Sequence, residues 1–454
     1  MESFLPASGL RDLEFARDAF LTNEKRWRVI YHNDGDGVAA ASVLATALLR
    51  LGKSFQLTPF TEVELSAMKS LEQETRGPIL VVDTGSSLLS ALDHHTDTVL
   101  VLDHHKPSEG AGFSRKEHSF VNPHRWGIDG MNDLCGSMLA YLFAKFLDER
   151  NVDLILWALS GAIADRQHFG GFRGVNLSLV KDAEMKGKVS RERGLLLMGG
   201  TVGEALTSSV DPYFVGLSGS KDETRKHLTS LGIDPDATVS SLNATQREKL
   251  SSALLTRLIS QGTRPEFCEA FTGDSYQIPA GKLDAQTASL LQNATARENE
   301  PSVGIAMALG DPKALARAWE LEKNWRAAVL QNLRRLEQTI DKKRALQWFY
   351  VSEAALGGAV AGLGLNYFLD STRPAFALGK RGGVIKVSAR GTKWLVEQGL
   401  DLDQALREAA RSVQGEGGGH RVASGATIPP GSEERFLDKA DELLSVQLSA
   451  LKRT

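Results

Sequence analysis

Apolar and polar positions alternate in blocks over the first 190 or so residues. Short apolar runs, "WRVIYH" at 27–32, "ILVV" at 79–82 and "TVLVL" at 98–102, each lead into a polar or glycine-containing turn. Runs of this length that are rich in β-branched residues predict buried strands. Segments of helical composition lie between them, such as "VAAASVLATALLRLG" at 38–52. This alternation predicts an α/β fold built on a parallel sheet.

Polar side chains cluster where the predicted strands end. "HNDGD" at 32–36 follows the first strand, Asp83 follows the second, and Asp103-His104-His105 follows the third. An apolar segment, "LILWALSGAIA", predicts a helix that leads to Asp165. Parallel strands end at one edge of a sheet, which is where α/β proteins bind ligands. We therefore expect Asp165 and the three strand-end clusters to converge in one pocket.

The triplet Asp-His-His occurs twice, at 93–95 and at 103–105. The second copy follows a predicted strand, so it is delivered to the functional edge of the sheet. The first copy follows "SSLLSAL", which reads as a short helix, and it precedes the same strand. We therefore predict that the second triplet belongs to a site and that the first does not.

The remainder of the chain has a different pattern. Residues 191–345 are polar and helical, with an amphipathic helix predicted over 244–262 and a longer connecting helix over 312–346. After residue 345, apolar runs, helices and dense glycine indicate a smaller α/β domain. We predict three regions: an N-terminal α/β domain at 1–190, a helical middle region, and a C-terminal domain at 346–454.

Composition narrows the class of protein. Of the 454 residues, 42% are hydrophobic and 24% charged, which is ordinary for a soluble globular protein. The formal charge of −3 argues against a protein that coats nucleic acid through global basicity, although it leaves a nuclease open. Two cysteines cannot form a disulfide framework, and no run approaches the ~18 apolar residues that span a membrane. We expect a cytoplasmic protein without a membrane association.

The converging side chains are suited to divalent cations. Carboxylates and imidazoles are ligands for Mn²⁺ and related ions, and closely packed carboxylates resist simultaneous ionisation unless cations are present. Each residue alone has another explanation, since Asp-Gly-Asp-Gly often forms a turn and a strand-end aspartate often caps a helix. Their joint placement favours a site for two ions that share one carboxylate.

Two sets of motifs carry a family resemblance. Asp34-x-Asp36, Asp83, Asp103-His104-His105 and Gly161-x-x-x-Asp165 occur in the order typical of the DHH phosphoesterase superfamily. "GGGHRVASGA" near the C-terminus resembles the glycine-rich motif of the DHH-associated domain, and "VNPHRWGIDG" and "SSVDPYFVGLSG" resemble archaeal RecJ-like nucleases. The resemblance implies a DHH catalytic domain, a DHH-associated substrate-binding domain and a catalytic cleft between the two lobes.

The resemblance also implies roles for the residues of the first set. One ion would be held by three residues, His32, Asp34 and Asp83. The second would be held by four, with the bridging residue shared: Asp36, Asp83, His104 and Asp165. His105 would face the scissile phosphate or leaving group, and Asp103 would orient the histidines. His32 departs from the pattern, because in many relatives this histidine precedes Asp-x-Asp by four residues instead of two.

The C-terminal motif is assigned to substrate binding. Glycines allow backbone N–H groups to approach a phosphate or sugar closely, a role expected of Gly417, Gly418 and Gly419. His420 would contact a phosphate, Arg390 would grip one with two hydrogen bonds, and Ser388 would add another. A basic stretch agrees with an anionic substrate: Lys380, Arg381, Lys386, Arg390 and Lys393.

These features together predict an exonuclease for single-stranded DNA or RNA that depends on two divalent ions, Mn²⁺ or Mg²⁺. One alternative is a phosphodiesterase of short oligonucleotides or cyclic dinucleotides. Another is a replication factor that binds a GINS-type partner, because the superfamily includes a catalytically degraded member that serves the eukaryotic replicative helicase. In that case we expect residues 191–345 to supply the partner surface, with nuclease activity retained or reduced.

Overall fold

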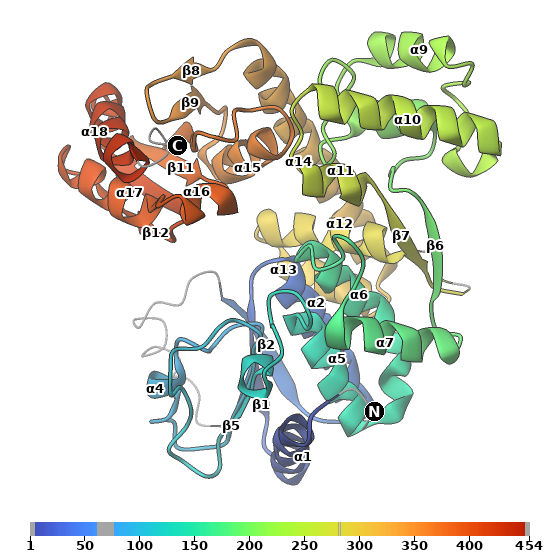
Figure 1. Cartoon of the computed structure of the whole chain (residues 1–454). Helices are drawn as coiled ribbons and strands as arrows, with labels where there is room; N and C mark the ends of the chain where they lie inside the picture. The colour runs from blue at the N-terminus through green and yellow to red at the C-terminus, as the bar shows by residue number, and fades with distance from the viewer. Residues whose placement is uncertain (1–4, 61–76, 280, 282, 450–454) are drawn as a thin grey trace. The chain divides into compact units, whose positions relative to one another are not determined.

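The chain forms two compact units, and each is built from segments that are not contiguous. The computed structural model describes residues 5–60, 77–279, 281 and 283–449. One unit combines 1–194 with 273–325, and the other combines 195–272 with 326–454 (Figure 1). The predicted helical middle region therefore contributes to both units instead of standing apart.

A five-stranded parallel sheet forms the centre of the first unit. Its strand order is β2-β1-β3-β4-β5, and all neighbouring strands pair in parallel. The strands are β1 Trp27–His32, β2 Phe55–Phe60, β3 Ile79–Val82, β4 Val99–Leu102 and β5 Ser119–Val121. In register, Tyr31 lies opposite Val82, which lies opposite Leu102. The residues after β1, β3 and β4 therefore emerge at one edge, as predicted.

Helices lie on both faces of this sheet, and further helices of the unit pack against them. They are α1 Ala7–Thr22, α2 Gly35–Arg50, α4 Leu89–Leu92, α5 Gly136–Leu147, α6 Ile155–Ala164, α7 Gly174–Met185, α12 Ala285–Arg297 and α13 Pro301–Ala308. Alternate strand residues enter two separate cores: Val29 packs with α2 and α5, whereas Ile30 packs with α4. Such continuous apolar strands are typical of parallel sheets buried on both faces.

Helix α2 is buried on nearly all sides. It packs against α5 and α6 and also against α12 and α13, which come from the predicted middle region. An all-round apolar helix needs partners on every side, and "GVAAASVLATALL" offers small residues for close approach. The two added helices thus complete the core beneath the functional edge of the sheet.

The middle region also contains two strands that the sequence pattern did not predict. β6 Ser190–Leu195 pairs with β7 Thr272–Gln277 in a separate two-stranded sheet. The run "SRERGL" is largely polar and exposed, so it carries no apolar signal of a strand. Two of the three points at which the chain passes from one unit to the other fall within this pair of strands.

The second unit contains a six-stranded mixed sheet and eight helices of its own among the described residues. The strand order is β12-β13-β11-β10-β9-β8. The strands are β8 Asp341–Lys342, β9 Gln347–Tyr350, β10 Ala375–Arg381, β11 Val384–Arg390, β12 Glu416–Gly419 and β13 Ala423–Ile428. The helices are α8 Val202–Ser208, α9 Lys221–Ser230, α10 Ala244–Ser260, α11 Pro265–Phe271, α15 Gly357–Tyr367, α16 Lys393–Glu397, α17 Leu402–Arg411 and α18 Glu433–Gln447. The predicted α/β fold of the C-terminal region is confirmed.

Helix α14, Pro312–Gln338, is shorter than the predicted helix over 312–346. Its apolar face is buried at Trp325, Val329, Leu333 and Leu336, as its periodicity indicates. The helix ends at Gln338, and strand β8 begins at Asp341. Across the described ranges, no helix combines the length and the hydropathy that a membrane crossing requires.

Candidate metal centre

The turn after β1 places His32 beside Asp34. Asp34 caps helix α2, accepting a hydrogen bond from the Gly37 N–H through Oδ1 (2.9 Å), while its Oδ2 lies 2.8 Å from His32 Nδ1. A Cβ on Gly37 would lie 2.1 Å from the His32 carbonyl oxygen, so this turn requires glycine. Burial raises the pKa of Asp34, but His32 and the Gly37 N–H outweigh burial and hold the pKa at about 2.

Asp36 is held by the start of helix α5. Its carboxylate is buried and accepts hydrogen bonds from the N–H groups of Gly136 (2.7 Å) and Ser137 (3.0 Å). The N-terminus of a helix stabilises such a negative charge. A Cβ on Gly136 would lie 2.3 Å from Asp83 Oδ1, and one on Gly161 would lie 2.4 Å from Asp36 Oδ1. Glycine in α5 and in α6 therefore lets both helices approach the carboxylates.

Asp83 is a buried carboxylate without a hydrogen-bond donor. The residue directly follows β3, adopts a left-handed φ of 58°, and is only 1% exposed. Neither of its oxygens accepts a hydrogen bond. Burial, and after it the negative charges of Asp36, Asp34 and Asp165, raises its pKa well above the usual range. A buried anion is costly unless it is paired, so this residue requires cations to be stable in its charged form.

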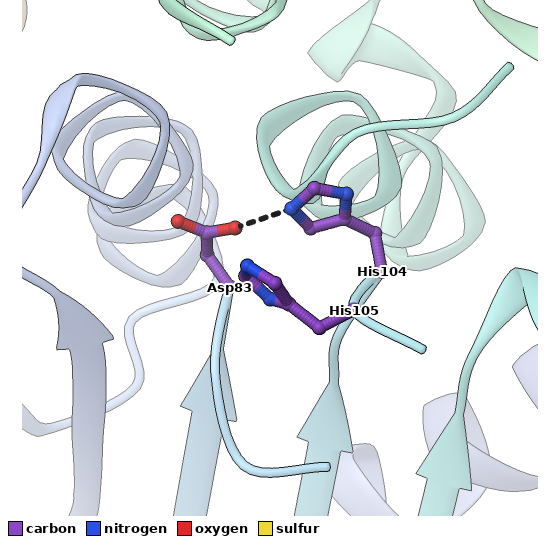
Figure 2. A group of neighbouring side chains, drawn as sticks. All are labelled: Asp83, His104 and His105. Atoms are coloured by element: carbon purple, nitrogen blue, oxygen red, sulfur yellow. Dashed lines mark ion pairs between the residues drawn. The ribbon is translucent and has the colours of Figure 1, made fainter. Parts of the chain in front are cut away.

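His104 directs one ring nitrogen at these carboxylates. Its Nδ1 lies 2.8 Å from the carbonyl oxygen of Gly130 and donates to it, which leaves the lone pair of the neutral ring on Nε2. Nε2 lies 3.1 Å from Asp83 Oδ1 (Figure 2). It also lies 3.5 Å from Asp165 Oδ2 and 3.9 Å from Asp36 Oδ2. Three carboxylates and one imidazole lone pair thus face a common point.

Asp165 reaches this point from the end of a helix, as the apolar segment before it predicts. It is the residue directly after α6, and the negative end of the helix dipole adds to the local negative potential. Burial, followed by the charge of Asp36, raises the pKa of Asp165 to about 7, although His104 opposes this shift. Both the helix before Asp165 and its convergence with the strand-end residues were therefore predictable from the sequence.

Asp103 holds the second histidine of its triplet. Its Oδ2 accepts from the Ser86 N–H (2.8 Å), and its Oδ1 accepts from the His105 N–H (3.2 Å) and lies 2.8 Å from His105 Nδ1. Burial raises the pKa of Asp103, but the hydrogen bond from His105 outweighs it and holds the pKa at about 2. The side chain of His105 is 46% exposed. Asp103 therefore orients His105, whereas Gly130 orients His104.

All six residues predicted to bind metal come together. Among the described residues, three groups have ligand atoms within 4.8 Å of one another: His32, Asp34 and Asp83; Asp36, His104 and Asp165; and Asp83, His104 and His105. The first group contains the three residues expected around one ion. The second contains three of the four expected around the other, and the fourth, Asp83, lies 3.1 Å from His104 Nε2. Oxygen and imidazole nitrogen donors in this ratio fit Mn²⁺ and related ions.

The first triplet has structural contacts instead. Asp93 follows α4 and accepts hydrogen bonds from Ser114 and from the Arg115 N–H. His95 Nε2 lies 2.8 Å from the Gly77 carbonyl oxygen. The three ligand groups found in the described part of the chain do not include this triplet. These contacts fasten loops at the edge of the sheet where β4 begins.

The C-terminal domain places Ser388 and Arg390 on one face of β11, since they are two residues apart on a strand. Cβ atoms on Gly357 and Gly358 would lie 3.2 Å from Ser388 Oγ and 2.5 Å from Arg390 Nη2. The start of helix α15 therefore approaches both side chains through glycine. Burial lowers the pKa of Arg390, and no carboxylate pairs with it among the described residues. A guanidinium without an acidic partner beside a helix N-terminus suits an anion.

The three predicted glycines lie on β12, and packing explains two of them. A Cβ on Gly417 would lie 2.6 Å from the Leu406 carbonyl oxygen in α17, and one on Gly419 would lie 2.9 Å from the Ala423 carbonyl oxygen. Gly418 lies opposite Gly425, which lies opposite Ser388, so it shares a row of the sheet with that serine. His420 is exposed at the turn between β12 and β13. At Gly417 and Gly419, close packing requires glycine, a reason that the sequence pattern did not reveal.

Comparison with known proteins gives two family matches. Residues 27–163 match the model of the DHH family, N-terminal domain, and residues 351–446 match that of the DHHA1 domain. An uncharacterized protein of Methanocaldococcus jannaschii is 29% identical over 430 residues, which cover 93% of this chain and 94% of the relative.

Two solved structures share the fold over nearly the whole chain. CDC45 from Entamoeba histolytica has a TM-score of 0.71 at 10% identity, with 96% of this chain and 99% of that chain covered. The exonuclease RecJ bound to manganese has a TM-score of 0.62 at 18% identity, with 98% and 96% covered. At these identities the likeness establishes a common fold.

Proposed function

Because the chain belongs to the DHH family and carries a DHHA1 domain, we propose that it is a metal-dependent phosphodiesterase that degrades single-stranded nucleic acid from its ends. One observation carries the proposal. Asp83 is a fully buried carboxylate without a hydrogen-bond donor, and three more carboxylates lie around it. A protein does not gain stability from such a cluster, so the cluster is explained by cations that it binds.

The chain supplies ligands for two divalent ions in two groups that share a bridging residue. The first group is His32, Asp34 and Asp83, and the second is Asp36, His104 and Asp165. Asp83 would bridge them, since its Oδ1 lies 3.1 Å from His104 Nε2. When bound, Mn²⁺ or Mg²⁺ supplies Lewis acidity that activates water and offsets the charge on the phosphoryl group. The common fold with a RecJ structure that contains manganese supports this choice of ions.

His105 is proposed to act on the scissile phosphodiester. Its Nδ1 is engaged by Asp103, which leaves Nε2 of the half-exposed side chain as the ring nitrogen for the substrate. Burial lowers the pKa of His105, but Asp103 outweighs burial and raises it above the usual range. A protonated ring in this position can donate a hydrogen bond, and then a proton, to the leaving oxygen.

The C-terminal domain is proposed to hold the polynucleotide. Arg390, Ser388 and the N-terminus of α15 form a set of donors for one phosphate. Exposed Lys380 and Arg381 extend the positive charge along the β10–β11 hairpin beyond that phosphate. This length of basic surface favours an oligonucleotide over a dinucleotide, because each phosphate of a strand gains its own contact.

The test is digestion of end-labelled 20-nucleotide DNA and RNA single strands, with a dinucleotide in parallel. In the presence of Mn²⁺, we expect the single strands to be shortened from one end and a chelator to stop the reaction. His104→Ala is expected to abolish it, whereas the matched variant His94→Ala, which alters the exposed histidine of the first triplet, is expected to leave it unchanged. If only the dinucleotide were hydrolysed, the proposed polymeric substrate would be wrong and a short substrate would take its place.

A second candidate function, a replication factor with a GINS-type partner, is favoured by the common fold with CDC45 over nearly the full length of both chains. Deletion of residues 191–345 is not a clean test, since its segments complete both compact units. The variant Asp83→Asn separates the two functions. A partner role predicts that this variant retains binding to purified GINS while hydrolysis is lost, and absence of binding by the unsubstituted chain would contradict it.

A further inference from the structure

The carbonyl of Gly130 accepts hydrogen bonds from two buried side chains. His104 Nδ1 lies at 2.8 Å and Gln167 Nε2 at 2.9 Å from the same oxygen. Gly130 is the last residue of the segment "VNPHRWGIDG". This segment contributes none of the candidate metal ligands. A carbonyl oxygen has two lone pairs, so both are engaged and the oxygen is held from two directions.

Gln167 is itself fixed by a further amide. Its Oε1 accepts a hydrogen bond from Asn176 Nδ2 at 2.7 Å, which directs its own NH₂ group to Gly130. Asn176 lies in the first turn of α7, and its backbone N–H donates to the Asp133 carbonyl at 2.8 Å. Gln167 and Asn176 are both buried. The four groups thus form one directed chain, from Asn176 through Gln167 to Gly130, where His104 also donates.

This chain joins two segments that carry candidate ligands. Gln167 follows Asp165 by two positions, so the shared carbonyl ties the turn of Asp165 to the ring of His104. The approach depends on glycine, because a Cβ on Gly130 would lie 2.0 Å from the His104 carbonyl oxygen. The Nε2 of His104 and Oδ2 of Asp165 lie 3.5 Å apart at the other end of this arrangement.

We propose that Gln167 and Asn176 are positioning residues that hold Nε2 of His104 toward the carboxylates of Asp83 and Asp165. The inference rests on the proposed metal-dependent function. It adds that Gln167 and Asn176 help to set the affinity for the metal. An imidazole with a mobile acceptor at Nδ1 samples other ring orientations, and each departure removes one ligand. Residues that orient a ligand in this way contribute about 10–100-fold to metal affinity in other proteins.

The test compares Gln167→Met with the unsubstituted full-length chain. Methionine keeps the length of the side chain and removes its donor. We expect Mn²⁺ affinity, measured by calorimetric titration, to fall about 10-fold. We also expect the Mn²⁺ concentration for half-maximal hydrolysis to rise by the same factor, with the rate restored at saturating Mn²⁺. A residue that only supports the fold would lower the unfolding temperature and leave the affinity of the folded chain for Mn²⁺ unchanged.

Gln347→Met is the matched control. Gln347 is another buried glutamine, and its Nε2 donates to the carbonyls of Asp370 and Arg373 in the C-terminal domain. We expect this variant to lower the unfolding temperature without changing the affinity for Mn²⁺. The contrast separates loss of an amide hydrogen bond in general from loss of the one at Gly130.

Asn176→Leu provides a second route if Gln167→Met fails to fold. Asn176 acts through Gln167, so Asn176→Leu as a single variant should weaken Mn²⁺ binding. Combined with Gln167→Met, it should cause no further loss of affinity. If the unsubstituted chain binds Mn²⁺ and both single variants bind it with the same affinity, the positioning role alone would be overturned. Absence of Mn²⁺ binding by the unsubstituted chain would overturn the proposed function as well.

Discussion

Asp93-His94-His95 and Asp103-His104-His105 are the same three residues in the same order, and they lie at opposite ends of strand β4. In the first triplet, the aspartate and the last histidine bond to nearby loop groups. In the second, the aspartate holds one histidine while the other faces three carboxylates. The contrast shows that position relative to a parallel sheet, more than residue type, decides which copy meets other ionisable groups.

The largest expected difference between the triplets is in catalysis. His104→Ala should reduce hydrolysis by at least about 10³-fold, because metal binding supplies several kcal/mol of transition-state stabilisation at about 1.4 kcal/mol per tenfold. His94→Ala should change it less than about twofold. The measurement is initial rate on a labelled single strand at fixed Mn²⁺. Equal losses in both variants would remove the distinction.

A smaller difference in hydrolysis rate is expected between the last histidines of the two triplets, His95 and His105. His105→Ala should slow hydrolysis by about 10²-fold without weakening Mn²⁺ binding, since its proposed role is proton donation. His95→Ala should leave the rate unchanged and lower the unfolding temperature, because its ring is bonded to the Gly77 carbonyl. Rates and Mn²⁺ titrations of both variants test this, and a His105→Ala protein with a full rate would contradict the assignment.

The acidic residues should differ in the sign of their effect on stability. Asp83→Asn should raise the free energy of unfolding of the metal-free protein at pH 7 by about 1–3 kcal/mol, because it removes a buried charge that has no donor. Asp93→Ala should lower the free energy of unfolding slightly, through loss of its hydrogen bonds. Denaturant unfolding in chelator measures both, and a destabilised Asp83→Asn protein would show that the carboxylate is satisfied without metal.

The smallest expected effect is the pH dependence of the metal-free protein. The folded-state pKa of Asp165 is raised to about 7, so the folded protein binds more protons than the unfolded chain between about pH 4 and pH 7. Stability should therefore fall as pH rises through that window. Asp165→Asn should flatten the slope, and Mn²⁺ should reverse it. A stability that rises with pH in this range would contradict the direction of the shift.

The sequence predicted the sheet and its polar edge because both follow from local patterns. "ILVV" and "VLVL" are too short and too apolar to be surface helices, and a parallel sheet then places the residues after them together. The partners of α2 were not predictable, because an all-apolar helix does not specify which helices cover it. The hydrogen bonds that Gly130 accepts were equally hidden, since no pattern of residue types encodes a backbone acceptor brought in by the fold.

The most direct test of the central claim is a crystal of the unsubstituted chain grown with Mn²⁺ and measured for anomalous scattering at the manganese edge. We expect two manganese peaks about 3.5–4 Å apart, both beside Asp83, with His104 Nε2 coordinating one of the two ions. A crystal without manganese peaks at Asp83, or with the Asp83 carboxylate bonded to protein donors instead, would contradict it.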